Sequence, residues 1–544
     1  MPQHEGECDL VDDAVEGPDA LAAQMEDLEL DKENLATHLD GLRSSSTVKQ
    51  HEALIAFRQL LSMDGTPPID EVIQLGVVSS FVELLKEGSE PKLQLDAAWA
   101  ITNICSGTEV QTKAVVESGA IPLLIDLLES PSEDVVEQAL WGLGNIAGDT
   151  EESRSILQKH KFLRSLLHLL KDRKLPLPCL RTAVWVLSNM ARGEDSISIE
   201  LVESSVPALK TLLLAEDEEV LRDACFACSY LSDGPNERVQ AFIDNGVIEI
   251  ITVLLGHINP SVVYPALRTI GNVVSGTDAQ TQAVLDAGFV PLAVRILRKC
   301  LERRVLQEAC WAISNVTAGN PRHIQVVMDE KAVPLLIELM RVGGPGVRRE
   351  AAWAVGNALA GGTVEQVREI ATQQCIRHLC DLLSFADTEV VGLALDALRN
   401  ALAVTSRVSA VDGDRGRLEG DDCEGDNDDY FWLYARWIDR AGGLTKLARL
   451  WNHASGAVAE KAACLLGLLV DLPPQDLPDL DLLDDEDEDV EGTSDVDTEE
   501  WVEEEEELPG RGIGRQGRRN RALSEAKGGA CGHGGEAVGA GNAV

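Results

Sequence analysis

Aromatic residues are scarce in this chain of 544 residues, at 4%, whereas apolar residues as a whole make up 44%. A buried core must therefore be built from Leu, Val, Ile and Ala, a mixture that favours helices packed on helices. The length exceeds what one hydrophobic core organises, so we expect several domains or an elongated array of repeats.

Basic residues are also few, since 47 Lys and Arg face 92 Asp and Glu, for a net charge of -45. Such a field repels phosphate backbones and anionic lipid headgroups, which excludes nucleic acid and membrane as favoured partners and favours a basic one. No run of 18 apolar residues occurs, and the N-terminus is acidic rather than signal-like. We therefore expect a soluble intracellular protein whose 12 scattered cysteines stay reduced.

The negative charge is concentrated in three segments. Residues 1–47 carry a net -11, residues 411–430 a net -7 and residues 471–510 a net -20, while residues 511–544 carry +4. Segments so charged and so poor in apolar residues are typical of disorder. We predict an acidic disordered N-terminal segment at 1–47, a folded body at 48–470 interrupted by an acidic loop insertion at 411–430, and a disordered tail at 471–544.

The folded body is periodic. Residues paired at a spacing of four recur every 41 to 44 residues, which is typical of a helical solenoid of armadillo or HEAT length. The pairs are Trp99/Asn103, Trp141/Asn145, Trp185/Asn189, Phe226/Tyr230, Arg268/Asn272, Trp311/Asn315, Trp353/Asn357 and Asp396/Asn400.

Each repeat has readable helix boundaries. In GAIPLLIDLLESPSEDVVEQALWGLGNIAGD, a Gly ends one helix, Pro122 stands near the start of the next, and a longer helix follows a polar break. The sequence therefore predicts an all-α fold, a right-handed superhelical solenoid of about ten armadillo repeats.

The Trp/Asn pairs predict a peptide-binding ladder. Residues four apart leave the same helix face, and equivalent helices of a solenoid lie side by side. An Asn amide can donate to and accept from a peptide bond, and neighbouring indoles form slots that favour Lys or Arg side chains. Burial in the core is the alternative for a single Trp, but a polar amide repeated at one register is an unlikely core choice. The Trp rungs fall into two runs, with Phe226 and Arg268 between them. This arrangement suits a peptide that has one basic cluster, or one that has two basic clusters joined by a spacer.

The sequence of the repeats resembles that of importin α, the adaptor family that recognises nuclear localisation signals. The matching phrases include AAWAITNICSGTEVQT, EQALWGLGNIAGD, ALRTIGNVVSGTDAQTQAVLDAG and EAAWAVGNALAGGTVEQV, and the similarity covers residues 90–405 well. The resemblance implies protein transport between cytoplasm and nucleus, with basic cargo signals bound in extended form.

The resemblance also implies two sites. Its major site would comprise Trp99, Asn103, Gly107, Thr112, Trp141, Asn145, Asp149, Trp185 and Asn189, with Asp149 pairing the key signal lysine. Its minor site would comprise Trp311, Asn315, Glu350, Trp353 and Asn357, with Arg268 and Asn272 at the intermediate rung. For Asp149 the alternative is a helix-end role in a turn.

The chain departs from the family where the family binds importin β. Residues 1–50 contain only three basic side chains, Lys32, Arg43 and Lys49, where the family has an Arg/Lys-rich segment. Importin β binding is therefore left open, and a scaffold or cytosolic chaperone for basic proteins is the alternative function. The family often has an acidic stretch near its exportin-binding region, and the acidic run 471–507 stands at that place. The alternative is that this run is a solubilising tail. The arginines of 511–521 suggest a competitor that occupies the ladder in cis.

Motifs that suggest catalysis lack their context. Gly512, Gly514 and Gly517 form a GxGxxG without a strand before it, and Cys225 and Cys228 form a CxxC without a second pair at zinc spacing. We therefore expect no enzyme, no cofactor and no metal.

Overall fold

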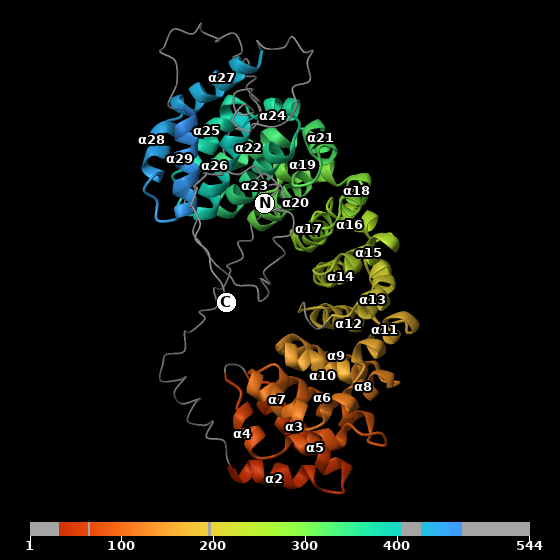
Figure 1. Cartoon of the computed structure of the whole chain (residues 1–544). Helices are drawn as coiled ribbons and strands as arrows, with labels where there is room; N and C mark the ends of the chain where they lie inside the picture. Colours follow the sequence, from red (N-terminus) through yellow and green to blue (C-terminus); the bar gives the residue numbers. More distant parts are fainter. Residues whose placement is uncertain (1–31, 64–65, 194–196, 404–425, 470–544) are drawn as a thin grey trace, which may run out of the picture. The chain divides into compact units, whose positions relative to one another are not determined.

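The computed structural model describes residues 32–63, 66–193, 197–403 and 426–469 (Figure 1). The described part of the chain is helical throughout and contains no strand. None of its helices is both long and apolar enough to cross a membrane. Residues 1–31 of the predicted N-terminal segment and residues 411–425 of the predicted insertion lie outside the described residues. The whole predicted tail 471–544, with its GxGxxG and its arginines, also lies outside them.

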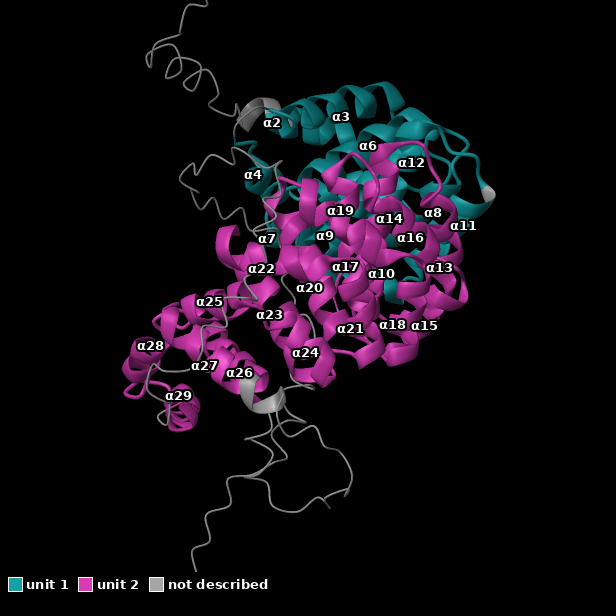
Figure 2. Ribbon diagram, turned by 90° about the horizontal axis from the view of Figure 1, so that it is seen from above, with its two compact units in different colours: residues 1–186 teal, residues 187–544 magenta. Residues whose placement is uncertain are grey.

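Two compact units, residues 1–186 and 187–544, divide the chain (Figure 2). The helices of the first are α2 (Lys32–Leu42), α3 (Thr47–Leu61), α4 (Ile69–Gln74), α5 (Val78–Leu84), α6 (Pro91–Cys105), α7 (Glu109–Glu117), α8 (Ala120–Asp126), the 3-10 turn η1 (Leu127–Glu129), α9 (Glu133–Asp149), α10 (Glu151–Lys159), α11 (Phe162–Asp172) and most of α12 (Leu177–Met190).

The second unit continues the same sequence of helices. They are α13 (Ile199–Leu212), α14 (Glu218–Leu231), α15 (Asn236–Asp244), α16 (Ile248–Leu254), α17 (Pro260–Val274), α18 (Asp278–Asp286), α19 (Phe289–Lys299), α20 (Arg303–Thr317), α21 (Pro321–Asp329), α22 (Ala332–Val342), α23 (Pro345–Gly361), α24 (Val364–Ile370), α25 (Gln373–Leu382), α26 (Thr388–Ala403), α27 (Asp426–Arg440), α28 (Gly443–Leu450) and α29 (Gly456–Leu469).

Most repeats consist of two shorter helices and a longer third one. The first two are joined by a residue in the left-handed region: Gly119 and Gly288 at φ 81° and 83°, and in two repeats a lysine, Lys161 or Lys331, at φ 58° and 57°. Glycine adopts this conformation without strain, and it lets the chain reverse within a few residues. The predicted Gly–Pro junction is therefore confirmed, with lysine as a variant of it.

The long third helices pack against one another. In the first unit α3, α6 and α9 are neighbours in that order, and in the second unit α14, α17, α20, α23, α26 and α29 follow the same pattern. Their buried faces are Leu, Ile, Val and Ala side chains, as the composition predicts. The all-α class and the armadillo repeat are confirmed, and every rung of the ladder lies on a third helix.

Two predicted segment boundaries are wrong. Helix α2 lies inside the segment 1–47, and its Leu42 is buried. Helix α27 begins at Asp426, inside the insertion 411–430. In both places the net charge of the segment led to a prediction of disorder where a helix is present. Helix α2 carries Leu35, Leu39 and Leu42 at helical spacing. In α27 the carboxylates lie in the first turn, where a helix favours negative charge.

Candidate functional site

The first-unit rungs present indole rings on the surface of consecutive third helices. Trp99 on α6 is 39% exposed and Trp141 on α9 is 42% exposed, so both rings are accessible to a ligand. The rings of Trp141 and Trp185 lie 5.2 Å apart between centroids and are tilted by 43°. Trp141 and Trp185 therefore form a paired aromatic surface, in which the two rings contact each other instead of leaving a slot between them.

Small residues three positions after a rung make room for the next indole. A Cβ on Gly144 would overlap the ring of Trp185, and a Cβ on Gly271 would overlap the ring of Trp311. The same position holds Thr102, Ser188, Ser229, Ser314 and Gly356 in other repeats. Sequence reasoning missed this requirement, although the small residues recur at the period of the rungs.

Gly271→Ala is therefore expected to displace the Trp311 ring and to destabilise the second unit by about 1–3 kcal/mol, the usual cost of overpacking. Gly467→Ala in α29 is the matched control, because a Cβ there meets nothing within 4 Å and alanine favours a helix. Thermal unfolding and the near-ultraviolet circular dichroism of the indoles measure both effects. Equal melting temperatures for the two variants would contradict the assigned role of Gly271.

The ladder asparagines bind the preceding repeat through their amide nitrogen. The Nδ2 atoms of Asn145, Asn272, Asn315 and Asn357 donate to the carbonyl oxygens of Thr102 (3.2 Å), Ser229 (2.9 Å), Gly271 (3.3 Å) and Ser314 (2.9 Å). Asn103 donates to the hydroxyl of Ser62 at 2.8 Å, and Asn189 is buried. The expectation that both amide groups serve a ligand is therefore too simple, because the donor already joins adjacent repeats.

At one rung the amide oxygen has no partner within the described part of the chain. The Oδ1 atom of Asn357 is buried without a hydrogen-bond partner among the described residues. A buried acceptor left unsatisfied is costly, and a peptide N–H would satisfy it. The geometry thus divides one side chain between a structural donor and an available acceptor.

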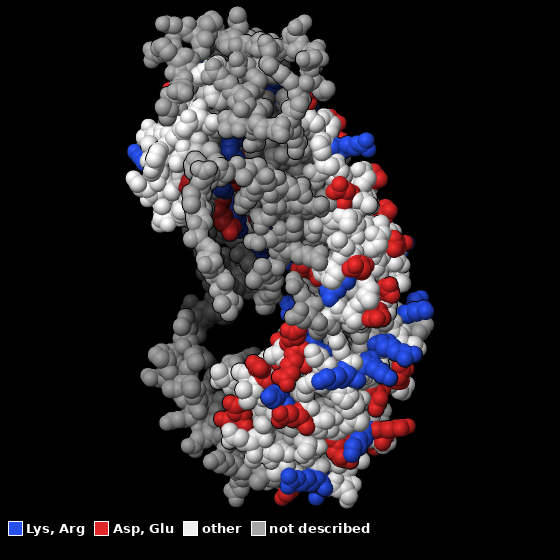
Figure 3. All heavy atoms as spheres, in the orientation of Figure 1, with Lys and Arg blue, Asp and Glu red and all other residues white. Residues whose placement is uncertain are grey.

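Asp149 ends α9 next to the rung of Asn145. Burial raises the pKa of its carboxyl group above the usual value; the hydroxyl of Ser153, which donates to Oδ2 at 3.4 Å, opposes this shift, and Glu109 adds to it. In Figure 3 carboxylate side chains gather where Figure 1 places α7, α9 and α10. An ammonium ion bound here would stabilise the carboxylate that its surroundings disfavour.

Gly107 and Thr112 build the turn between α6 and α7. Thr112 is buried, and its hydroxyl donates to the carbonyl of Cys105 at 3.3 Å. A side chain at Gly107 would overlap Gln111, whose Oε1 accepts from the N–H of Thr108 in a capping box. The same turn is found at Gly276 and Thr281, so these residues position the start of the following helix, with Gly107 exposed and Thr112 buried.

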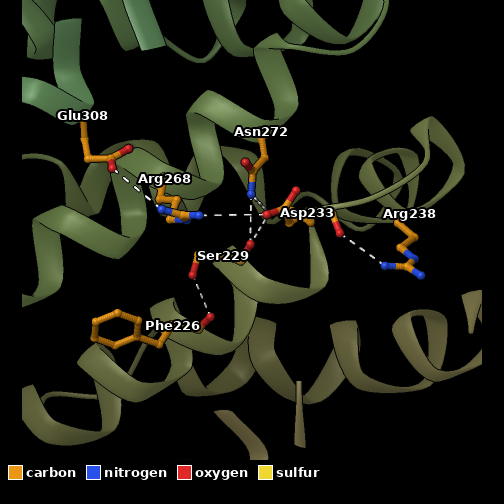
Figure 4. Close-up of polar contacts among 8 residues, drawn as sticks. Phe226, Ser229, Asp233, Arg238, Arg268, Asn272 and Glu308 are labelled. Carbon is orange, nitrogen blue, oxygen red and sulfur yellow. Dashed lines mark hydrogen bonds and ion pairs between the residues drawn. The ribbon is translucent and has the colours of Figure 1, made fainter. Parts of the chain in front are cut away.

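At the intermediate rung, Arg268 lies between two carboxylates of the second unit (Figure 4). Its Nη1 and Nη2 atoms are 3.9 Å from Glu308 and 4.0 Å from Asp233. Burial alone would lower the pKa of Arg268, but Glu308, Tyr264 and Asp233 outweigh it and raise the pKa. The guanidinium is thus held by acids of the same unit, which explains why this rung interrupts the indole ladder.

The acids that precede the rungs by three residues form a second series. Asp96, Asp223, Glu308 and Glu350 stand three positions before Trp99, Phe226, Trp311 and Trp353. Only Glu350 is among the predicted site residues, and the spacing of Glu350 to Trp353 is the signal that identifies the other three. Asp96, Asp223 and Glu350 are buried. Each acid of the series has an arginine partner: Asp96 with Arg58, Asp223 with Arg222, Glu308 with Arg268 and Glu350 with Arg349.

The first of these acids brings a further residue to the ladder. Arg58 on α3 bonds to Asp96 at 2.5 Å, and its guanidinium carbon lies 4.5 Å from the centre of the Trp99 ring. His51 is 2.9 Å from the other oxygen of Asp96. A cation–π contact of this geometry is what the ladder is predicted to offer a ligand, and here the chain's own arginine makes it on one side of Trp99.

The remaining predicted residues are distributed as follows. Trp311 lies on α20, and Trp353 on α23 is buried. Asp396 on α26 pairs with Lys461 at 2.6 Å and with Arg399 at 3.7 Å. Cys225 and Cys228 are both fully buried in α14, and burial raises the pKa of both thiols.

Known proteins match the chain along most of its length. The Armadillo/beta-catenin-like repeat family matches residues 65–106, 108–148, 277–318, 320–360 and 363–403. Importin subunit alpha-1b of Oryza sativa subsp. japonica is 42% identical over 446 residues, which cover 82% of this chain and 80% of that protein. Importin subunit alpha-3 of Arabidopsis thaliana is 43% identical over 435 residues, or 80% and 79%. A crystal structure of an engineered protein aligns with a TM-score of 0.70 at 26% identity, covering 81% of this chain and 99% of that one.

Proposed function

The chain belongs to the importin α family, and from this premise we propose that it is a nuclear import adaptor that shuttles between cytoplasm and nucleus. It binds Lys/Arg-rich nuclear localisation signals in extended form along the Trp/Asn ladder. The observation that carries this proposal is that accessible indoles on consecutive third helices lie in the same unit as the Asp149 carboxylate. No part of this function is catalytic.

Each component of the ladder has a distinct task in signal binding. The faces of Trp99, Trp141 and Trp185 contact the aliphatic stems and cationic heads of signal side chains. The Asn oxygens accept peptide N–H groups, which holds an extended backbone without reading its sequence. Asp149 pairs with one lysine ammonium and thereby sets the register. In the second unit the corresponding residues are Trp311, Asn315, Trp353 and Asn357, with Glu350 as the acid, although Trp353 is buried there, unlike Trp99 and Trp141.

Titration of the full chain with a fluorescent lysine-rich signal peptide tests this function. We expect saturable binding that an excess of the unlabelled peptide reverses, and much weaker binding of a peptide with alanines in place of the lysines. Binding that does not distinguish the two peptides would contradict recognition by the ladder. Binding dominated by bulk charge would also decline much more steeply with salt than contacts among indoles and amides do.

The pH dependence of binding provides a separate prediction for Asp149. An ammonium ion binds the carboxylate form, so binding lowers the pKa of Asp149 below its raised value in the free protein. Affinity is therefore greatest above the free pKa and falls as the pH drops through it. We expect binding to weaken as the pH falls from neutral through this raised pKa, with the slope reduced in Asp149→Asn. Calorimetric titration across this range measures both slopes, and parallel curves would refute the assignment.

A scaffold or chaperone for basic proteins is the second candidate, because residues 1–50 contain only three basic side chains. The structure adds that α2, within this segment, packs on α3 and buries Leu42. A pull-down of importin β by the full chain separates the two functions. Retention of importin β supports the import adaptor, whereas intact signal binding without importin β supports the scaffold.

A further inference from the structure

A pocket of about 1060 Å³ lies in the second unit, away from the third helices. Its walls come from the start of α22, the turn from α24 into α25, and one face of α27. Pockets for drug-sized ligands span roughly 300 to 1,000 Å³, so this one can take a large side chain with its flanking backbone. None of the predicted signal-binding residues lines it.

The α27 wall of the pocket is aromatic. Tyr430, Leu433, Tyr434 and Trp437 stand at positions i, i+3, i+4 and i+7 and all line the pocket. The Tyr434 and Trp437 rings lie 5.5 Å apart, and Met328, Val333 and Ile337 complete an apolar lining. This surface favours an aromatic or large aliphatic side chain.

A buried hydroxyl in the same wall lacks a hydrogen-bond partner. Tyr434 is 1% exposed, and its Oη atom bonds to no other atom of the described residues. Burial raises the pKa of Tyr434, so the phenol keeps its proton and can donate it. An unsatisfied buried donor of this kind costs about 1–3 kcal/mol, which a carbonyl or carboxylate ligand would recover.

Basic side chains add a preference for negative charge. The guanidinium of Arg368 lies 4.6 Å from the centre of the Tyr430 ring, and the exposed Lys331 also lines the pocket. Glu369 is the one acid in the lining, which leaves a net positive charge. The pocket is therefore suited to an aromatic side chain embedded among carboxylates.

The C-terminal tail contains one segment of that kind. Trp501 is the only aromatic residue of 470–544 and stands in TEEWVEEEEE, between Glu500 and Glu503. Acidic solvating tails are poor in aromatics, so a single Trp at the centre of the acidic run requires a reason. The 31 residues between Leu469 and Trp501 behave as a chain of about 30 Å end to end and extend to about 100 Å, enough to reach the pocket from α29 within the same unit.

We propose that this pocket, lined by α22, α24, α25 and α27, binds the acidic segment around Trp501 in cis. The indole enters between the α27 aromatics and the apolar side chains of α22. Carboxylates flanking the indole pair with Arg368 and Lys331, and a carbonyl or carboxylate oxygen accepts from Tyr434. Tethering keeps the local concentration of the segment in the millimolar range, so weak contacts suffice.

Photo-cross-linking of the full chain tests the proposal. Benzoylphenylalanine replaces Trp501, the protein is irradiated at low concentration, and monomeric products are mapped by mass spectrometry. We expect cross-links to the 328–337, 368–374 and 430–437 segments. The double variant Lys331→Glu/Arg368→Glu should reduce their yield about tenfold. Arg322→Glu/Arg377→Glu is the control, since it makes the same charge change at exposed residues outside the pocket.

Several outcomes would overturn the proposal: cross-links only to other parts of the chain, covalent dimers instead of monomeric products, or yields that the two double variants reduce equally. If the double variant does not fold, Lys331→Glu alone replaces it as the test, because Lys331 is exposed and its substitution should leave the fold intact. Hydrogen exchange provides a second measurement, for which the only substitution is at residue 501 and the folded body keeps its own sequence. Trp501→Ala should accelerate amide exchange in 368–374 and 430–437 several-fold, and unchanged exchange there would also overturn the proposal. Signal-peptide affinity is independent of both measurements.

Discussion

Asp149→Lys is expected to weaken binding of a lysine-rich signal peptide about 100-fold. The substitution removes the carboxylate that pairs with a signal lysine and places a like charge in the same position, and truncating one partner of a desolvated charge pair typically costs 2–5 kcal/mol. The effect should be large because partial burial and Glu109 already disfavour the Asp149 carboxylate, so an ammonium ion stabilises it more than it would a fully solvated acid. Fluorescence anisotropy with a labelled peptide measures the change.

The matched control is Asp126→Lys. Asp126 is an exposed residue at the end of α8 and undergoes the same charge change within the same unit. If bulk charge dominated recognition, the two variants would lose affinity equally. If Asp149 acts as the specific partner, Asp126→Lys should change the affinity less than about threefold, the range of weak surface electrostatics. Circular dichroism confirms that both variants remain folded.

The repeat could be predicted from the sequence because it depends on side chains that recur at one register. The rung pairs mark the third helices, and all eight first members from Trp99 to Asp396 lie on such helices in the structure. Junction glycines such as Gly119 also follow from local backbone chemistry, which a single repeat contains in full. Local signals of this kind require no knowledge of how repeats stack.

Contacts between repeats could not be predicted in the same way. The donor of Asn145 bonds to a carbonyl 43 residues earlier, and Arg58 reaches Asp96 across 38 residues. Every residue has a backbone carbonyl, so the sequence gives no sign that the Asn amide nitrogen donates to one in the preceding repeat. Small residues three positions after the first seven rungs can be found in the sequence, but their role is clear only once the next indole is in place, as at Gly271 and Trp311.

Charge counting failed where a charged segment also contains a helix. The net charge of 1–47 indicated disorder, yet α2 buries Leu42 and brings His38 to an edge-on ring contact with Phe57. Composition averages over a segment, whereas folding depends on whether apolar residues share one helix face. The same error at 426–430 concealed the start of α27, whose aromatic face forms one wall of the pocket.

Trp141→Ala is expected to weaken a signal peptide with one basic cluster about 30-fold. The Trp141 ring is 42% exposed and packs beside Trp185, so its loss removes aromatic contact surface at two neighbouring rungs. Central aromatic residues of an interface commonly cost 2 kcal/mol or more on truncation. Trp451→Ala is the control, because this exposed indole follows α28, outside the ladder, and should leave affinity unchanged.

A peptide with two basic clusters extends this prediction to the second unit. Trp353→Ala should leave the affinity for a one-cluster peptide unchanged and weaken a two-cluster peptide about tenfold, because only the longer ligand contacts both runs of rungs. Counted along the sequence, three or four repeats of 8–10 Å each predict a spacer of about 9–12 residues between the two clusters. Shortening the spacer well below that length should make the two-cluster peptide insensitive to Trp353→Ala. Equal sensitivity of both peptides to Trp353→Ala would show that the second run of rungs belongs to the same site as the first.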